Sequence, residues 1–235
     1  MPRKIEVCLT PALIDLYAIE NSIVVVIDIL RATSSIVYGI DNGAEAIIPV
    51  AQVEDCLNYA DRGYLLAAER NGEVVKGYNF GNSPFSYSAD KVAGKTVVLT
   101  TTNGTKALHL ARKASKVVIG SFLNLQPLCD WLKSQDQDVL LLCAGWKDQF
   151  NLEDTIFAGA VVQELRPLFT DFDDAGVAAE DLYVMAKDNL RAYVGKSAHS
   201  HRMIALNIEE DIKFCLQLNI CQAIPVLQGD KLVAL

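Results

Sequence analysis

Polar residues that can bind a metal ion or a phosphate group follow three apolar runs of the sequence. They are Asp28 and Arg31 after run 23–27, residues 100–105 after run 97–99, and Gly145, Glu153 and Asp154 after run 139–143. Carboxylates are ligands for hard cations such as Mg²⁺, and guanidinium groups bind phosphate through paired hydrogen bonds. Successive backbone N–H groups at a turn can hold an anion. Together these residue types indicate chemistry on a phosphorylated compound.

The first group ends a run of five β-forming residues. Asp28 and Arg31 are followed closely by Thr33, Ser34 and Ser35. An ion pair and an ordinary helix cap would explain each residue taken alone. A carboxylate, a guanidinium and several hydroxyls at one strand end favour a functional interpretation, with Asp28 and Arg31 in catalytic roles.

The second group is the sharpest local signal in the chain. It consists of Thr100, Thr101, Thr102, Asn103, Gly104 and Thr105. Hydroxyls and backbone N–H groups at a turn that enters a helix are typical of an anion-binding nest, whereas a Thr-rich strand end with an Asn-Gly turn is the structural alternative. The sequence is not a P-loop, because the order Gly104-Thr105-Lys106 is reversed and the upstream glycine is missing.

The third group joins a glycine to two adjacent acids. Gly145 allows a close approach of the backbone, and Glu153 and Asp154 open the next expected helix. Acids in a first helical turn often only complement the helix dipole. If they face the same region as Asp28, however, they form a plausible site for a hard cation.

A long segment between expected strands adds further candidates. Glu69 and Arg70 end an apolar run, and Asn82 and Ser83 follow in the segment 71–93. A surface ion pair and a turn are the alternative, and they would contribute little to stability. The sequence His199-Ser200-His201 is interpreted as a polar loop or a capping segment rather than as a metal site.

Strand-like runs alternate with helical patterns along the chain. The runs lie at 4–8, 23–27, 46–50, 64–68, 96–99, 116–119, 139–143 and 224–227, and the helical patterns at 105–114, 125–134, 155–165, 178–189 and 208–218. This alternation predicts an α/β fold, layered α/β/α with a largely parallel or mixed sheet, and it allows two similar, intertwined halves. We expect a single domain over residues 1–235, with loops at 71–93 and 168–176. Open sheets of this kind bind ligands at the carboxyl ends of their strands.

Composition limits the classes of partner. The 235 residues carry 21 Lys and Arg against 29 Asp and Glu, a net charge of −8, which argues against broad nucleic-acid binding. The N-terminus lacks the apolar core of a signal peptide, and no uncharged apolar stretch approaches the roughly 20 residues of a membrane span. The six cysteines include no C-x-x-C pair, so we expect buried, reduced thiols and a cytoplasmic protein.

Taken in order, several segments resemble one known family. They are Val-Ile-Asp-Ile-Leu-Arg-Ala-Thr at 26–33, Glu69-Arg70, Phe-Gly-Asn-Ser-Pro at 80–84, the 100–105 segment, and Cys-Ala-Gly at 143–145 with Phe-Asn-Leu-Glu-Asp at 150–154. This set resembles the 2-phosphosulfolactate phosphatase family, Mg²⁺-dependent acid phosphatases associated with coenzyme M biosynthesis. The chain departs from the family pattern at 71–80 and at 146–149, and these departures concern the substrate rather than the class of reaction.

The resemblance implies a phosphatase that hydrolyses a small anionic 2-phospho acid, with 2-phosphosulfolactate giving sulfolactate and phosphate. Catalytic roles are expected for Asp28, Arg31, Glu153 and Asp154, and Mg²⁺ ligands among Asp28, Glu69, Glu153 and Asp154. Substrate-binding roles are expected for Arg70, Asn82, Ser83, Thr100, Thr101, Thr102, Asn103, Gly104, Thr105 and Gly145. The nucleophile is either metal-bound water or Asp28 itself.

The competing hypothesis is a non-catalytic protein that binds a small phosphorylated or sulfonated acid in the same pocket. In either case we expect a small-molecule ligand, no nucleic acid and no membrane, with a homodimer as the assembly to consider.

Overall fold

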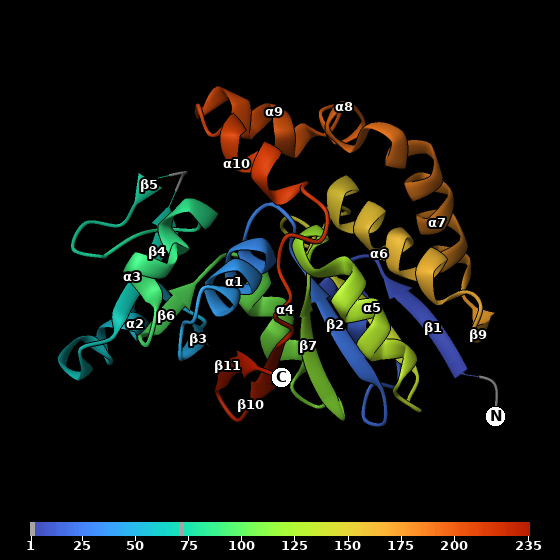
Figure 1. Cartoon of the computed structure of the whole chain (residues 1–235), viewed down its shortest axis with the longest axis horizontal. Coiled ribbons are helices and arrows are strands. Elements are labelled where there is room, and N and C mark those ends of the chain that lie inside the picture. The colour runs from blue at the N-terminus through green and yellow to red at the C-terminus, as the bar shows by residue number, and fades with distance from the viewer. Residues whose placement is uncertain (1–2, 71–72) are drawn as a thin grey trace.

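The computed structural model describes residues 3–70 and 73–235, without the side chains of Arg70 and Glu73. Within these residues eleven strands form one mixed sheet in the order β5-β4-β6-β3-β11-β10-β7-β2-β8-β1-β9 (Figure 1). The strands are β1 (Arg3–Cys8), β2 (Ile23–Ile27), β3 (Ala46–Val50), β4 (Leu65–Arg70), β5 (Glu73–Val74), β6 (Thr96–Thr100), β7 (Lys116–Gly120), β8 (Val139–Cys143), β9 (Phe169–Phe172), β10 (Pro225–Gln228) and β11 (Lys231–Ala234).

The helices pack on both faces of this sheet. They are α1 (Ala32–Asp41), α2 (Val53–Leu57), α3 (Ala89–Val92), α4 (Gly104–Ala111), α5 (Leu125–Lys133), α6 (Leu152–Leu165), α7 (Asp174–Ala186), α8 (Leu190–Val194), α9 (Ala198–Ala205) and α10 (Glu209–Cys215). The predicted α/β class with a mixed sheet is therefore confirmed.

Alternate residues of β2 explain the layers. All five residues of this strand are buried, as expected of a central strand that is covered on both faces. Val25 belongs to a core cluster that it shares with residues of α5 and α6. Val24 and Val26 belong to a second cluster, which they share with residues of α1 and α4. Because successive strand residues point to opposite faces, β2 packs against one helical layer on each face of the sheet.

The sheet consists of two parallel blocks. Strands β7, β2, β8, β1 and β9 pair in parallel, and so do β3, β6 and β4. The β10–β11 hairpin joins the blocks through antiparallel pairs, Val226 with Val118 and Leu232 with Ile47. The blocks therefore run in opposite directions. A twist of roughly 20–25° per strand, over the steps from β2 to β6, can turn their ends toward one another.

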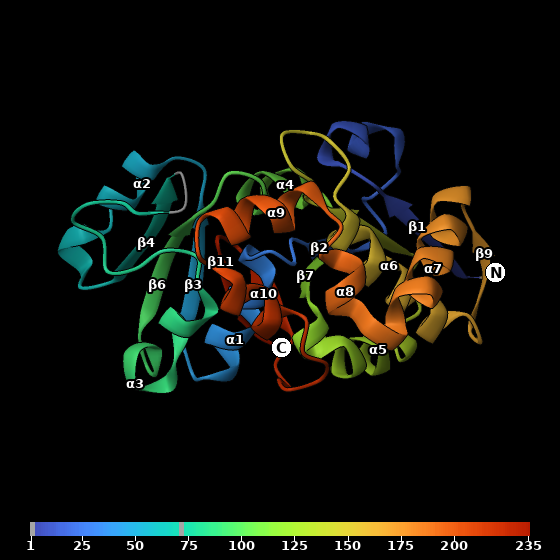
Figure 2. The same ribbon diagram turned by 90° about the horizontal axis from the view of Figure 1, so that it is seen from above.

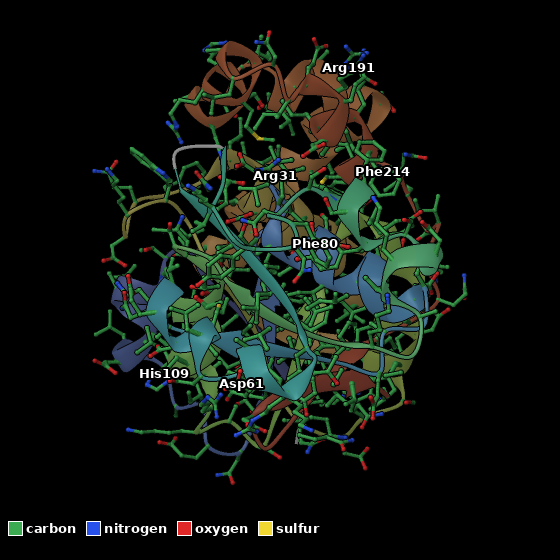
Figure 3. All side chains as sticks on the ribbon, turned by 90° about the vertical axis from the view of Figure 1, so that its left-hand side faces the viewer. Arg31, Asp61, Phe80, His109, Arg191 and Phe214 are labelled. Atoms are coloured by element: carbon green, nitrogen blue, oxygen red, sulfur yellow. The ribbon has the colours of Figure 1, made fainter. Side chains whose placement is uncertain are left out.

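The last helices lie across the centre of the molecule. Figure 2 places α9 and α10 between the block that holds β3, β4 and β6 and the helices α6 and α7. Aromatic contacts hold α10 there, because the ring of Phe214 lies 4.9 Å from that of Tyr38 and 5.0 Å from that of Phe85. Figure 3 shows Arg31 beneath this C-terminal segment.

The predicted loop at 168–176 is wrong, because β9 pairs there with β1 and α7 begins at Asp174. This edge strand is short and partly exposed, so it lacks an apolar run. The backbone N–H of Gly176 donates to the carboxylate of Asp173, which caps α7 at 2.7 Å.

All six cysteines are buried, as predicted. In the described part of the chain, no helix has the length and apolar character that a membrane crossing requires.

Candidate active site

The turn after β2 presents Asp28. The backbone N–H of Thr33 donates to the carbonyl of Asp28 at 2.9 Å, and the backbone N–H of Asp28 donates to the hydroxyl of Thr33 at 3.0 Å. The N–H of Ala32, the first residue of α1, lies 3.4 Å from Oδ1 of Asp28. These contacts fix the half-buried carboxylate at the carboxyl end of a central strand.

The Thr-Asn-Gly turn (residues 100–105) lies directly against Asp28. Thr105 closes the turn, because its backbone N–H donates to the Thr101 hydroxyl at 3.1 Å and its own hydroxyl donates to the Thr101 carbonyl at 2.6 Å. A Cβ atom at Gly104 would lie 2.8 Å from Oδ2 of Asp28 and 2.8 Å from Cβ of Ala32. Only glycine fits at this position, and two of the three groups singled out in the sequence meet here.

Asp154 joins the third group to the first. Its Oδ1 accepts the backbone N–H of Ile29 at 2.9 Å, and its Oδ2 accepts that of Gly145 at 3.1 Å. The side chain is almost completely buried. Burial, followed by the charges of Glu153 and Asp28, raises the pKa of this carboxyl well above its usual range, although the two N–H donors act in the opposite direction. Asp154 thus links the loop after β2 to the loop after β8 through these two hydrogen bonds.

Glu153 makes a buried contact with a histidine. Its Oε1 lies 2.6 Å from Nδ1 of His199, and the carboxylate has no exposed surface. A carboxylate only accepts hydrogen bonds, so Nδ1 carries the proton in this pair. The other oxygen, Oε2, is buried without a hydrogen-bond partner among the described residues. His199 lies in the first turn of α9, where the Ser197 hydroxyl accepts the backbone N–H of Ser200 at 3.0 Å. The polar-loop alternative is therefore wrong, and the alternative of a capping segment is confirmed.

Arg31 is held by two carboxylates. Its guanidinium forms ion pairs with Glu69 at the end of β4 and with Asp211 in α10. The hydroxyl of Ser83 donates to the other oxygen of Asp211 at 3.0 Å. Both Arg31 and Asp211 are buried. The guanidinium is therefore fixed in orientation, and much of its charge is balanced within the protein.

Asn82 belongs to the same wall. Its backbone carbonyl accepts the hydroxyl of Ser35 at 2.5 Å, and its side-chain Oδ1 is buried without a partner in the part of the chain that the structure describes. The side chain of Arg70, predicted to bind substrate, lies outside the described residues.

A cavity of about 350 Å³ opens where these elements meet. The lining residues include Asp28, Arg31, Glu69, Asn82, Thr101, Thr102 and Asn103. The loop between β8 and α6 contributes Trp146 and Lys147, and α9 contributes His199 and Arg202. Thr100, Gly104, Thr105 and Gly145, which were predicted to bind substrate, are not among the lining residues.

Burial and neighbouring charge determine the protonation of Asp28. Burial is the main cause that raises its pKa from 3.8 to about 6, and the charge of Glu153 acts in the same direction. His199 and the backbone N–H groups of Ala32 and Gly104 act in the opposite direction. Asp28 therefore changes charge within the pH range in which many enzymes work.

The carboxylates differ in how available they are to a metal ion. Glu69 is paired with Arg31, and Asp154 is used by two backbone N–H groups. Within residues 3–70 and 73–235 no three His, Cys, Asp or Glu side chains form a ready-made metal site. Asp28 and the unpartnered Oε2 of Glu153 nevertheless suit Mg²⁺, which commonly takes one or two protein carboxylates together with water and substrate phosphate.

Several residues of the site carried little signal in the sequence. Asp211 looked like one of three acids in a first helical turn, and Trp146, Lys147 and Arg202 belong to no motif. Their roles depend on α9 and α10 lying over the sheet, which local sequence does not specify. The pair His199-His201 was the one visible hint.

Comparisons with known proteins agree on one family. A family model described as 2-phosphosulpholactate phosphatase matches residues 8–230. A probable 2-phosphosulfolactate phosphatase from Thermotoga maritima is 43% identical over 210 residues, which cover 89% of this chain and 90% of the relative. Proteins of the same name from Caldanaerobacter subterraneus and Clostridium novyi are 39% and 34% identical, over 88% and 97% of this chain and 88% and 99% of their own lengths.

Proposed function

Because this chain belongs to the 2-phosphosulfolactate phosphatase family, we propose that it hydrolyses 2-phosphosulfolactate to sulfolactate and phosphate in a Mg²⁺-dependent reaction. Its class, that of an enzyme which hydrolyses phosphoric monoesters, follows from the family. The observation that carries the rest is the contact between the Asp28 carboxylate and the Thr-Asn-Gly turn at one cavity.

The turn supplies the donors for the phosphate. It leads into α4, whose N-terminus carries a partial positive charge, although the N–H of Thr105 already donates to the Thr101 hydroxyl and that of Gly104 acts on Asp28. Thr101, Thr102 and Asn103 line the cavity at this point. A phosphate placed here would lie next to the Asp28 carboxylate, and two anions in contact repel each other unless a cation lies between them. This juxtaposition supports a metal-dependent reaction over simple anion binding.

Asp28 and Glu153 would hold the Mg²⁺ ion, with Asp154 and Glu69 as supporting carboxylates. When bound, Mg²⁺ supplies charge neutralisation between the carboxylates and the phosphate. Arg31, oriented by Glu69 and Asp211, contributes a fixed positive edge to the cavity. Phosphoryl transfer depends mainly on position and electrostatics, so this rigidity favours catalysis.

Two nucleophiles are compatible with this arrangement. In the first, a water oxygen attacks phosphorus, the bond from phosphorus to the C2 oxygen breaks, and that oxygen takes up a proton. In the second, the Asp28 carboxylate attacks, the same bond breaks, and water later hydrolyses the aspartyl-phosphate. Rapid quenching with hydroxylamine separates them, because only a covalent phosphoenzyme on Asp28 yields the hydroxamate.

The test of the proposed function is a phosphate-release screen over small phospho acids, with Mg²⁺ and with a chelator. We expect release from 2-phosphosulfolactate with Mg²⁺ and a loss of release with the chelator. Binding of the phospho acid without release under any metal would instead identify a non-catalytic binding protein. We also propose that the enzyme lies in the cytoplasm and has no nucleic-acid partner. We propose a homodimer as its assembly, which size-exclusion measurements in solution would test.

A further inference from the structure

Two cationic side chains each contact the indole ring of Trp146, which lines the cavity. The guanidinium carbon of Arg202, in α9, lies 4.0 Å from the centre of the Trp146 ring. The ammonium nitrogen of Lys147 lies 4.6 Å from the same ring. Cations in this position are attracted by the negative face of the ring, which restricts their motion. All three residues line the cavity. We refer to Lys147 and Arg202 as the Trp146 cation pair.

The charges of this pair are not balanced by the protein. Neither Lys147 nor Arg202 forms an ion pair with any described residue, whereas Arg31 across the cavity is bound by two carboxylates. The acid next in sequence, Asp148, is engaged by Lys106 at 2.7 Å. In a protein with net charge −8, two unbalanced cations on a cavity wall indicate a site for an anionic group.

The loop that carries Trp146 and Lys147 is tied to the Thr-Asn-Gly turn. The backbone N–H of Lys147 donates to the side-chain oxygen of Asn103 at 3.2 Å. The backbone groups of Trp146 and Gln149 exchange hydrogen bonds at 3.0 and 3.1 Å, which closes the loop on itself. Lys147 therefore lies beside the turn to which we assign the phosphate, and Arg202 approaches from α9 through its contact with Trp146.

We propose that Lys147 and Arg202, held over Trp146, bind the sulfonate of the substrate and thereby select 2-phospho acids that carry this second strong acid. The proposal rests on the proposed function, since it names the specificity element of the same site. A sulfonate offers three acceptor oxygens and a full negative charge at neutral pH. The two cations together offer donors for all three oxygens.

The experiment compares Arg202→Gln and Lys147→Gln with the wild-type enzyme on three substrates. The first is 2-phosphosulfolactate. The second is 2-phospholactate, in which a hydrogen atom replaces the sulfonate. The third is the 2-phosphate of 2-hydroxypropane-1-sulfonate, in which a methyl group replaces the carboxylate. We expect each variant to raise KM at least about tenfold for both sulfonates, with kcat within about threefold. For 2-phospholactate, KM should change by less than about twofold.

Matched controls lie elsewhere on the chain. Arg62 and Lys196 also stack on aromatic rings, at 4.9 Å from Tyr59 and 4.2 Å from Tyr193, but they do not line this cavity. Arg62→Gln and Lys196→Gln should leave KM unchanged for all three substrates. Arg202→Lys, which keeps the charge, should restore most of the affinity. Thermal melting of each variant verifies that it is folded.

Binding of sulfolactate, measured by calorimetry, separates failure of this proposal from failure of the proposed function. If the wild type releases no phosphate yet binds sulfolactate more tightly than Arg202→Gln does, the proposed function fails and the sulfonate site stands. If phosphate is released but the variants change KM equally for 2-phosphosulfolactate and 2-phospholactate, the sulfonate site is refuted. An effect on 2-phosphosulfolactate that disappears with the carboxylate-free substrate also refutes it, because the pair would then bind the carboxylate.

Discussion

We predict that Asp28→Asn stabilises the folded protein at neutral pH even though it removes activity. Burial, together with the charge of Glu153, raises the pKa of Asp28 from 3.8 to about 6. The folded state therefore binds this proton more tightly than the unfolded chain does. As the pH rises through this range, ionisation of Asp28 costs the folded state free energy, and the neutral amide of the variant avoids that cost.

The magnitude follows from the two pKa values. One pKa unit corresponds to about 1.4 kcal/mol, so the interval from 3.8 to about 6 corresponds to at most about 3 kcal/mol above pH 7. Near pH 4 the folded carboxyl is protonated and the unfolded one is half ionised, so the cost is only about 0.5 kcal/mol. For a chain of this size the neutral-pH value corresponds to roughly 6–12 °C in melting temperature.

The assay is thermal and denaturant unfolding of wild type and Asp28→Asn in the presence of a chelator, near pH 4, 5.5 and 7.5. The control is Asp188→Asn, the same substitution at an exposed aspartate outside the cavity. The stability gain of Asp28→Asn should grow with pH, and added Mg²⁺ should narrow it by stabilising only the wild type. An equal gain at all three pH values, or a loss of stability near pH 7.5, would refute this account of Asp28.

Two further substitutions test the surroundings of Asp28. Gly104→Ala should lower kcat/KM at least about a hundredfold and lower the free energy of unfolding by roughly 1–3 kcal/mol, because the new Cβ would lie 2.8 Å from Oδ2 of Asp28. Wild-type turnover by this variant would show that activity does not depend on the close contact between the turn and Asp28. His199→Asn removes a group that lowers the pKa of Asp28, so the acid limb of the pH–rate profile should shift to higher pH. Activity near pH 6 should then fall more than activity near pH 8. An equal fall in activity at all pH values would contradict this prediction.

Local patterns in the sequence were sufficient to predict the central strands and the groups at their ends. Continuous runs of mostly apolar residues mark β2, β6 and β8, because both faces of these strands are buried. Asp28 and the Thr-Asn-Gly turn follow such runs immediately, so their place at strand ends could be anticipated. Their meeting could not, because β2 and β6 belong to blocks that run in opposite directions.

The remaining parts of the site depend on contacts distant in sequence. Arg31 meets Asp211 across 180 positions, and Glu153 meets His199 across 46. No local periodicity specifies such pairs, because they arise from the packing of α9 and α10 over the sheet. The edge strand β9 escaped prediction for a related reason, since it is short, partly exposed and paired only with β1.

We propose that Asp28 and the Thr-Asn-Gly turn form a metal-dependent phosphatase site. The most direct measurement is the rate of phosphate release from 2-phosphosulfolactate by wild type and Asp28→Asn, with Mg²⁺ and with a chelator, on protein verified as folded. We expect rapid phosphate release only for wild type with Mg²⁺, and a rate at least about a thousandfold lower for Asp28→Asn. Release by the variant within about tenfold of wild type, or undiminished release with the chelator, would contradict it.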